Sequence, residues 1–105
     1  MRTSQKPEPE RFYYDVVRIL MVNDDWVTTE YLANLLDINV NDTRSVLAKM
    51  RKDGFPIIGK KHIGVKLAKT NAELTNYIDR LEREIETRMS AIDALNRIMK
   101  EGVEA

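Results

Sequence analysis

The sequence predicts a mainly α-helical protein that has a small α+β head with a two-stranded hairpin and a long, coiled-coil-like C-terminal helix. Three observations support this fold class. Helical apolar patterns fill residues 11–52, a glycine-bounded β-prone segment follows at residues 55–67, and a helix predicted at residues 70–102 carries an apolar repeat of threes and fours from residue 74 to 99. A chain of 105 residues has material for one core of this kind.

Composition narrows the function classes before any motif is considered. The chain is 43% hydrophobic and 32% charged, and it has neither an apolar run of membrane-spanning length nor a signal-peptide segment behind Met1. It contains no cysteine and one histidine, which removes disulfides, thiolate chemistry and most metal sites. We therefore expect a cytoplasmic protein that is not an enzyme, needs no cofactor or metal and does not bind membranes.

Charge is distributed unevenly along the chain, although the net charge is zero. Residues 42–69 carry eight basic residues and two acidic ones, whereas acidic residues outnumber basic ones in the segments on either side. A local basic patch can bind a polyanion even when the whole chain is neutral. The middle of the chain is therefore the segment to search for such a patch.

The first part of the chain predicts an arm and one helix. Residues 1–10 include two prolines and nothing to bury, so a flexible arm is expected. A helix should start near residues 8–11 and run to about Asn23. Because it is apolar on two sides, we expect other parts of the protein to pack against both of these faces. After a polar turn, Trp26 and Val27 read as a short β-like piece, with Trp26 in the core.

Two further helices and a hairpin follow. Thr28 or Thr29 can cap a second helix that runs to about Asp37. Asn39 can cap a third helix at residues 40–52, which Gly54 ends. Two short β-prone runs, separated by a basic tip at residues 59–64, then predict a β-hairpin.

The second and third helices resemble the helix-turn-helix of bacterial and phage regulators. The segment from Leu32 to Met50 reads LANLLDINVNDTRSVLAKM. The side chains that match the buried positions of that pattern are Leu32, Ala33, Leu36, Ile38, Leu47 and Met50. Asp37 departs from the glycine common at the turn, but aspartate tolerates the left-handed conformation better than most residues. The alternative interpretation is any small three-helix bundle.

The hairpin extends this resemblance. The segment GFPIIGKKHIGVKLAKT is similar to the wing of the winged helix-turn-helix family, especially its biotin-repressor-like branch, so the resemblance covers residues 11–68. Members usually insert the third helix into the major groove of double-stranded DNA, while the wing contacts the backbone or the minor groove. The DNA-contacting residues that the resemblance implies here are Thr28, Thr29, Asn41, Asp42, Arg44, Ser45, Lys49, Lys60, Lys61 and His62.

The last helix begins with a capping box formed by Thr70 and Glu73, and should end at Gly102. Its apolar repeat, interrupted by Arg88, consists of Leu74, Ile78, Leu81, Ile85, Ile92, Leu95 and Met99. A small head cannot cover about 45 Å of helix. The first helix of the head should cover part of it. We expect a homodimer in which the last helices pair, or in which each packs across the first helix of the other copy; the alternative is a helix that folds back on its own head.

Head and tail together resemble small phage and plasmid regulators and the bacterial replication-terminator type. The expected function is therefore a dimeric, DNA-binding regulator of transcription or replication. The competing function is a protein-interaction module, such as a phage-type inhibitor or replication accessory factor, in which the head is a scaffold and the apolar helix binds a host or replication protein. Net neutrality and Asp42 on the outward face favour this second function. A hydrolase or nuclease lacks a recognisable metal or nucleophile constellation.

Overall fold

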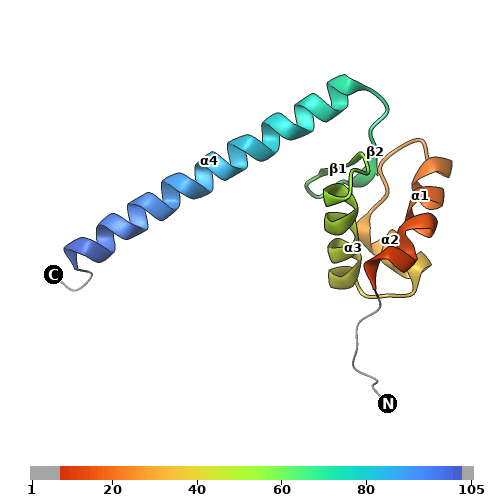
Figure 1. The fold of residues 1–105 in the computed structure, drawn as a ribbon, viewed down its shortest axis with the longest axis horizontal. Helices are drawn as coiled ribbons and strands as arrows, with labels where there is room; N and C mark the ends of the chain where they lie inside the picture. Colours follow the sequence, from red (N-terminus) through yellow and green to blue (C-terminus); the bar gives the residue numbers. More distant parts are fainter. Residues whose placement is uncertain (1–7, 103–105) are drawn as a thin grey trace, which may run out of the picture.

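A head and a long projecting helix make up the shape of the molecule (Figure 1). The computed structural model describes residues 8–102. Its elements are the 3-10 helix η1 (Pro9–Phe12), the helices α1 (Tyr13–Val22), α2 (Thr29–Leu36) and α3 (Val40–Lys52), the strands β1 (Ile57–Lys60) and β2 (Gly64–Leu67), and the helix α4 (Asn71–Glu101). The strands form a two-stranded sheet, so the predicted mainly helical class with a small β component is confirmed.

Local side chains start the helices of the head. The Thr28 hydroxyl accepts a hydrogen bond from the backbone N–H of Tyr31 at 3.1 Å, and the Asn39 side chain accepts one from the N–H of Asp42 at 2.7 Å. Each bond satisfies a backbone donor that a helix leaves free at its N-terminus. Asp37 ends α2 with a φ of 59°, the left-handed conformation expected of it. The predicted caps and turn are confirmed.

The core of the head lies where α1, α2 and α3 meet the hairpin. Its buried apolar cluster comprises Val16, Leu20, Val27, Leu32, Leu36, Val46, Leu47, Met50, Ile57 and Val65. Of the six positions predicted from the helix-turn-helix pattern, five are buried, and the sixth, Ile38, is half-buried and packs against the cluster. One face of α3 is therefore held in the core, which leaves its other face to solvent.

The hairpin is joined to the head through its second strand. β1 and β2 pair antiparallel, with Ile57 opposite Leu67 and Lys60 opposite Gly64. On the other edge of β2, Val27 exchanges two backbone hydrogen bonds of 2.8 Å with Val65. The predicted hairpin and β-like piece are confirmed, and the pairing places the hairpin tip beside the start of α2.

Trp26 corrects one expectation about the core. Its side chain is half-buried, and the ammonium of Lys66 lies 5.2 Å from the centre of its ring. Val27 occupies the core position instead. Successive side chains of an extended segment point to opposite faces, so only one of the two neighbours can face inward.

The long helix α4 has 31 residues, which corresponds to about 46 Å at 1.5 Å per residue. The Thr70 hydroxyl accepts a hydrogen bond from the N–H of Glu73 at 3.1 Å, as predicted. The Glu73 carboxylate, however, accepts from the N–H of Lys69 at 2.6 Å, one residue earlier than a full capping box requires. Figure 1 shows that α4 leaves the head after its first turns and extends into solvent.

The structure agrees with the predicted start of the first helix but not with the expected packing of the last one. Residues 1–7 of the predicted arm lie outside the described residues, and η1 begins at Pro9, within the range predicted for the start of the first helix. α4 packs on β1, with α1 on the other side of the hairpin in Figure 1, so α1 does not provide the expected cover for the tail. Within residues 8–102, no helix combines the length and apolarity needed to cross a membrane.

Candidate nucleic-acid interface

The outward face of α3 carries polar side chains because its inward face is anchored. Val46, Leu47 and Met50 are buried, whereas Asn41, Arg44 and Ser45 are exposed. The Arg44 guanidinium lies 3.5 Å from the Asn41 side-chain oxygen, and the Ser45 hydroxyl donates to the Asn41 carbonyl at 3.2 Å. Both contacts are local to α3 and leave Arg44 on the surface of the head.

A buried threonine completes the anchoring of α3 and was not predicted. Thr43 is fully buried, and its hydroxyl donates to the backbone carbonyl of Asn39 at 2.9 Å. A buried polar group is tolerated when it is hydrogen-bonded. The sequence could have indicated this role, because threonine on a helix often bonds to a carbonyl one turn earlier.

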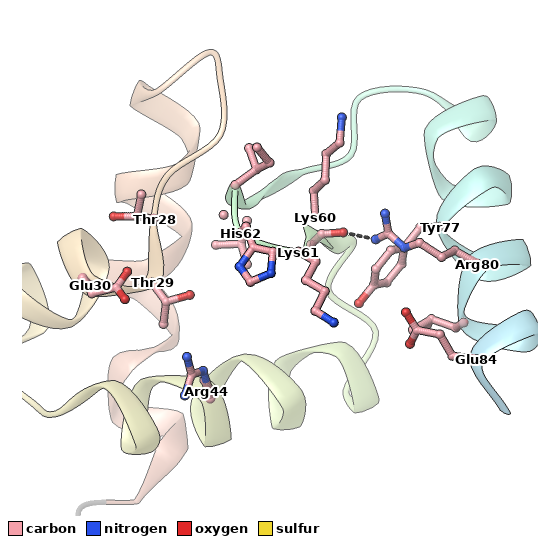
Figure 2. A pocket seen from close by; sticks show the side chains of 15 residues that line it. Thr28, Thr29, Glu30, Arg44, Lys60, Lys61, His62, Tyr77, Arg80 and Glu84 are labelled. Atoms are coloured by element: carbon pink, nitrogen blue, oxygen red, sulfur yellow. Dashed lines mark hydrogen bonds between the residues drawn. The ribbon is translucent and has the colours of Figure 1, made fainter. Parts of the chain in front are cut away.

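The hairpin tip presents a second set of cationic side chains. Lys60, Lys61 and His62 are exposed, and the N–H of Ile63 donates to the carbonyl of Lys60 at 2.9 Å to close the turn. His62 adopts a φ of 65°, which turns the chain sharply at this point. In Figure 2 the two lysines extend in opposite directions from the hairpin. Among residues 8–102, no carboxylate forms an ion pair with either lysine.

The hairpin tip, α2, α3 and α4 border one open recess of about 750 Å³ (Figure 2). Six of the ten residues predicted to contact DNA line it, namely Thr28, Thr29, Arg44, Lys60, Lys61 and His62. The other four, Asn41, Asp42, Ser45 and Lys49, are not part of its lining. Residues distant in the sequence thus share one concave surface.

Lys49 lies apart from this surface and is held by carboxylates. Its ammonium is 3.0 Å from Asp53 and 3.6 Å from Glu10. Asp53 also accepts a hydrogen bond of 2.7 Å from the Tyr13 hydroxyl. The hydrogen bond to Asp53 raises the pKa of Lys49, since it favours the charged form. We therefore leave Lys49 out of the candidate interface.

The first turns of α4 form a wall of the recess that sequence reasoning missed. Tyr77, Arg80, Leu81 and Glu84 contribute to the lining. The Arg80 guanidinium donates to the carbonyl of Gly59. The Cζ atoms of Arg51 and Arg80 lie 5.5 and 5.2 Å from the centre of the Tyr77 ring. The Arg51 side chain in turn donates to the carbonyl of Ile57 at 2.8 Å. α4 is thereby fixed to β1.

The recess is cationic with two acidic residues at its border. Arg44, Lys60 and Lys61 line it together with Glu30 of α2 and Glu84 of α4. A duplex or any other polyanion would meet the cations on the α3 and hairpin side and would be repelled by the carboxylates. The described residues include no cluster of side chains suited to hold a metal ion.

Comparisons with known proteins do not identify the chain. No family model matches it, and searches of curated proteins and of solved structures return no significant match. What the recess binds must therefore be inferred from its own residues.

Proposed function

We propose that the protein is a non-catalytic, cytoplasmic, double-stranded DNA-binding protein, which regulates transcription or replication as phage and mobile-element regulators do. The head acts as a winged helix-turn-helix of which α2 and α3 are the two helices and the β-hairpin is the wing. The observation that supports this proposal most directly is the shared recess. Arg44 on the outward face of α3 and Lys60 and Lys61 at the hairpin tip line the same concave surface.

The proposed docking follows from the position of each side chain. α3 enters the major groove with Arg44 as the base-reading residue, because a guanidinium can donate two hydrogen bonds to a guanine edge. Lys60, Lys61 and His62 contact phosphates, which carry no sequence information. The backbone N–H groups at the start of α2, next to Thr28, are directed to a further phosphate.

The dimer is the second part of the proposal. The repeat Leu74, Ile78, Leu81, Ile85, Ile92, Leu95 and Met99 pairs with the same repeat of another copy. All of these side chains are exposed in the single chain except Leu74, which is half-buried. Sedimentation at micromolar concentration should give a mass close to twice 12.2 kDa.

Binding to random duplex DNA as a function of salt tests the DNA part. We expect an affinity that falls steeply as salt rises, because each neutralised phosphate releases counterions. Lys60→Ala and Lys61→Ala should weaken binding to all sequences alike and reduce the salt slope by about one per lost contact. Arg44→Ala should cost about 1–3 kcal/mol on the preferred sequence and relax specificity at one base pair.

Arg18→Ala is the matched control, since it removes one positive charge from an exposed position of α1 that does not line the recess. It should bind duplex DNA like the wild type. Unchanged affinity in the Arg44, Lys60 and Lys61 variants would show that the recess is not the DNA site.

A protein-interaction module is the second candidate function. It is favoured by Glu30 and Glu84 in the recess and by the exposed apolar repeat of α4, which could bind a helix of a host or replication protein. Absence of duplex binding at micromolar protein and low salt would support this function in place of the first.

A further inference from the structure

The apolar repeat of α4 is uncovered over most of its length. Beyond the turns that lie on β1, Ile85, Ile92, Leu95 and Met99 are between 55% and 69% exposed. Because they recur at spacings of three and four when Arg88, between Ile85 and Ile92, is counted, these side chains form one stripe along the helix. A stripe this long needs a partner that is itself a long apolar helix.

A second copy of α4 fits the stripe from end to end. The geometry points to an antiparallel pair, an inference that rests on the dimer proposed above and assigns its direction. The facing residues, one from each copy, are Leu74 with Met99, Ile78 with Leu95, Leu81 with Ile92, and Ile85 with Arg88. This register gives every position of the repeat a counterpart.

Arg88 decides the direction of the pair. In a parallel pair each position faces its own equivalent, so the two Arg88 guanidinium groups would meet in one layer between the layers of Ile85 and Ile92. Two like charges in an apolar seam repel each other and lose hydration. In the antiparallel register Arg88 faces Ile85 of the second copy instead, next to Glu84 of that copy.

Glu84 supplies the neutralising charge from both helices. It lies four residues before Arg88 on the same helix, the favourable order for an ion pair. In the antiparallel register each guanidinium therefore has a Glu84 carboxylate from its own copy and another from the second copy within reach. The centre of the seam becomes an alternating cluster of two arginines and two glutamates.

The apolar residues of the repeat do not by themselves require an antiparallel pair. Isoleucine at one core position and leucine at the other, as in Ile78 and Leu81, favours parallel two-stranded coiled coils when nothing opposes it. The apolar layers of the antiparallel register pair leucine with isoleucine or methionine, which fill a similar volume. The cost of placing two Arg88 charges in one layer of a parallel pair therefore exceeds the preference of the isoleucine and leucine pattern for the parallel direction.

Residues beside the repeat also favour the antiparallel register. Ile98 is 49% exposed and would face Tyr77 of the second copy. The Tyr77 ring is already fixed against the head by Arg51 and Arg80. The apolar C-terminal turns of each α4 would thus pack on the head-proximal turns of the other, whereas a parallel pair leaves them far from both heads.

This arrangement sets the spacing of the two heads. The two-fold axis crosses the pair between Glu86 and Thr87, so the heads lie on opposite sides of the midpoint of the rod. The Arg80 residues of the two copies would be separated by about 20 Å along the paired α4 helices, at 1.5 Å per residue. Because Arg80 fixes α4 to β1, the direction of pairing fixes the distance between the two interfaces.

Disulfide cross-linking can test the direction without background, because the chain has no cysteine. Ile78→Cys, carrying a size tag, is mixed with untagged Leu95→Cys, allowed to exchange under reducing conditions and then oxidised. We expect a mixed, cross-linked dimer on a non-reducing gel. Each variant alone should stay uncross-linked, because its two cysteines would be about 25 Å apart along the rod, beyond the roughly 7 Å that a disulfide spans.

Other outcomes separate the direction from the dimer itself. If each variant cross-links alone and the mixture gives no mixed product, the pair is parallel and the inference is wrong. A dimeric mass in sedimentation with no cross-link in any sample rejects this register. A monomeric mass for the wild type rejects the dimer of the proposed function as well.

Discussion

At the scale of single residues, Gly64 is the position where the backbone tolerates least change. It adopts a φ of +143°, and a Cβ built there would lie 2.3 Å from the carbonyl oxygen of Val27. That oxygen belongs to the backbone pair that joins Val27 to Val65, so it cannot move without breaking the pair. The close approach of the two chains therefore requires glycine.

We predict that Gly64→Ala destabilises the head by about 2 kcal/mol or more, from the strained φ together with the clash. Urea denaturation followed by circular dichroism measures the loss. Gly54→Ala is the control, because Gly54 also has a positive φ of +100° but no neighbour within 4 Å of the added Cβ. The control should lose only about 1 kcal/mol, and equal losses in the two variants would mean that the Val27 contact is unimportant.

Also at the residue scale, the capping side chains and buried positions could be predicted because they depend on short spacings. Thr28, Asn39 and Thr70 each bond to an N–H three residues later, a relation the sequence displays directly. Trp26 could not be predicted in the same way. Which of Trp26 and Val27 faces the core depends on how Val27 pairs with Val65, almost forty residues later.

At the scale of elements, helix and strand bounds could be predicted, but the docking of α4 could not. Tyr77 and Arg80 lie within an apolar repeat, and their spacing alone is equally consistent with solvent-exposed coiled-coil positions. Their contacts with Arg51 and Gly59 depend on the hairpin being folded nearby. As a result, the sequence indicated the α3 and hairpin sides of the recess and missed the α4 side.

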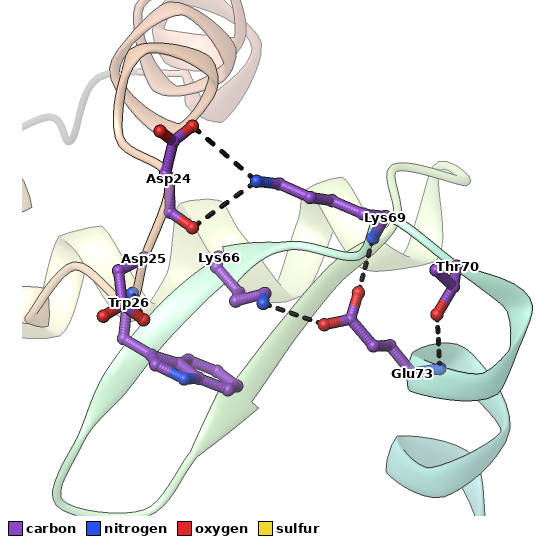
Figure 3. A network of polar contacts seen from close by, with 7 residues as sticks. All are labelled: Asp24, Asp25, Trp26, Lys66, Lys69, Thr70 and Glu73. Carbon is purple, nitrogen blue, oxygen red and sulfur yellow. Dashed lines mark hydrogen bonds and ion pairs between the residues drawn. The ribbon is translucent and has the colours of Figure 1, made fainter.

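The junction between β2 and α4 is held by a network around Glu73 (Figure 3). Its carboxylate pairs with the Lys66 ammonium at 2.8 Å and accepts from the N–H of Lys69. The Lys69 side chain reaches back to Asp24, with its ammonium 3.7 Å from the carboxylate. The hydrogen bond from Lys66, followed by that from Lys69, lowers the pKa of Glu73 below its ordinary value of 4.5.

We predict that this junction loses stability in acid. A carboxylate whose pKa is lower in the folded than in the unfolded state stabilises the fold above the unfolded pKa, and this stabilisation is lost as pH falls through the folded pKa. The window therefore begins near pH 4.5 and extends below it. Thermal melts of the wild type and Glu73→Gln should converge in that window, whereas a difference that stays constant with pH would contradict the role of the charge.

The apolar repeat of α4 gives a prediction, also at the scale of elements, about the direction in which two α4 helices pair. Arg88→Leu removes the charge that opposes a parallel pair, so the remaining isoleucine and leucine pattern should govern the direction. In this background we expect Ile78→Cys alone to form a disulfide-linked dimer, and the helix pair to melt at a higher temperature. Arg88→Lys keeps the charge and serves as the control, with no cross-link expected from Ile78→Cys. If Arg88→Leu leaves the cross-linking pattern of the wild type unchanged, the charge does not set the direction.

At the scale of the whole molecule, DNA binding and dimerisation are proposed for different parts of the structure. The cationic recess lies between the head and the first turns of α4, and the uncovered apolar stripe continues along α4, which extends the molecule to 56 Å along its longest axis. Arg80 and Glu73 fix one part to the other. Pairing of the α4 helices therefore determines how two heads are presented to one duplex. The residues proposed to contact DNA all lie on the head, although Leu81 and Glu84 of the proposed dimer contact also line the recess.

This separation predicts that a monomer keeps its DNA site and loses its avidity. Ile92→Asp places a charge in the apolar repeat at a position far from the head of its own chain, and should give a monomeric mass with an intact head. The probe is a duplex selected from a random pool that carries two half-sites about one turn apart. We expect Ile92→Asp to bind it about 100-fold or more weakly than the wild type does, because the second head no longer binds as part of the same molecule. On a duplex with one half-site the affinity should stay within about twofold of the wild type.

Ser90→Asp adds the same charge at an exposed position of α4 outside the repeat, and is expected to bind both duplexes like the wild type. Gel-shift titrations at a fixed salt concentration measure both affinities, because salt changes both heads alike. Equal losses of Ile92→Asp on one and two half-sites would indicate that the substitution damaged the head. Full affinity of a monomeric Ile92→Asp for two half-sites would mean that each head binds alone, and the rod would then have a purpose other than presenting two heads to DNA.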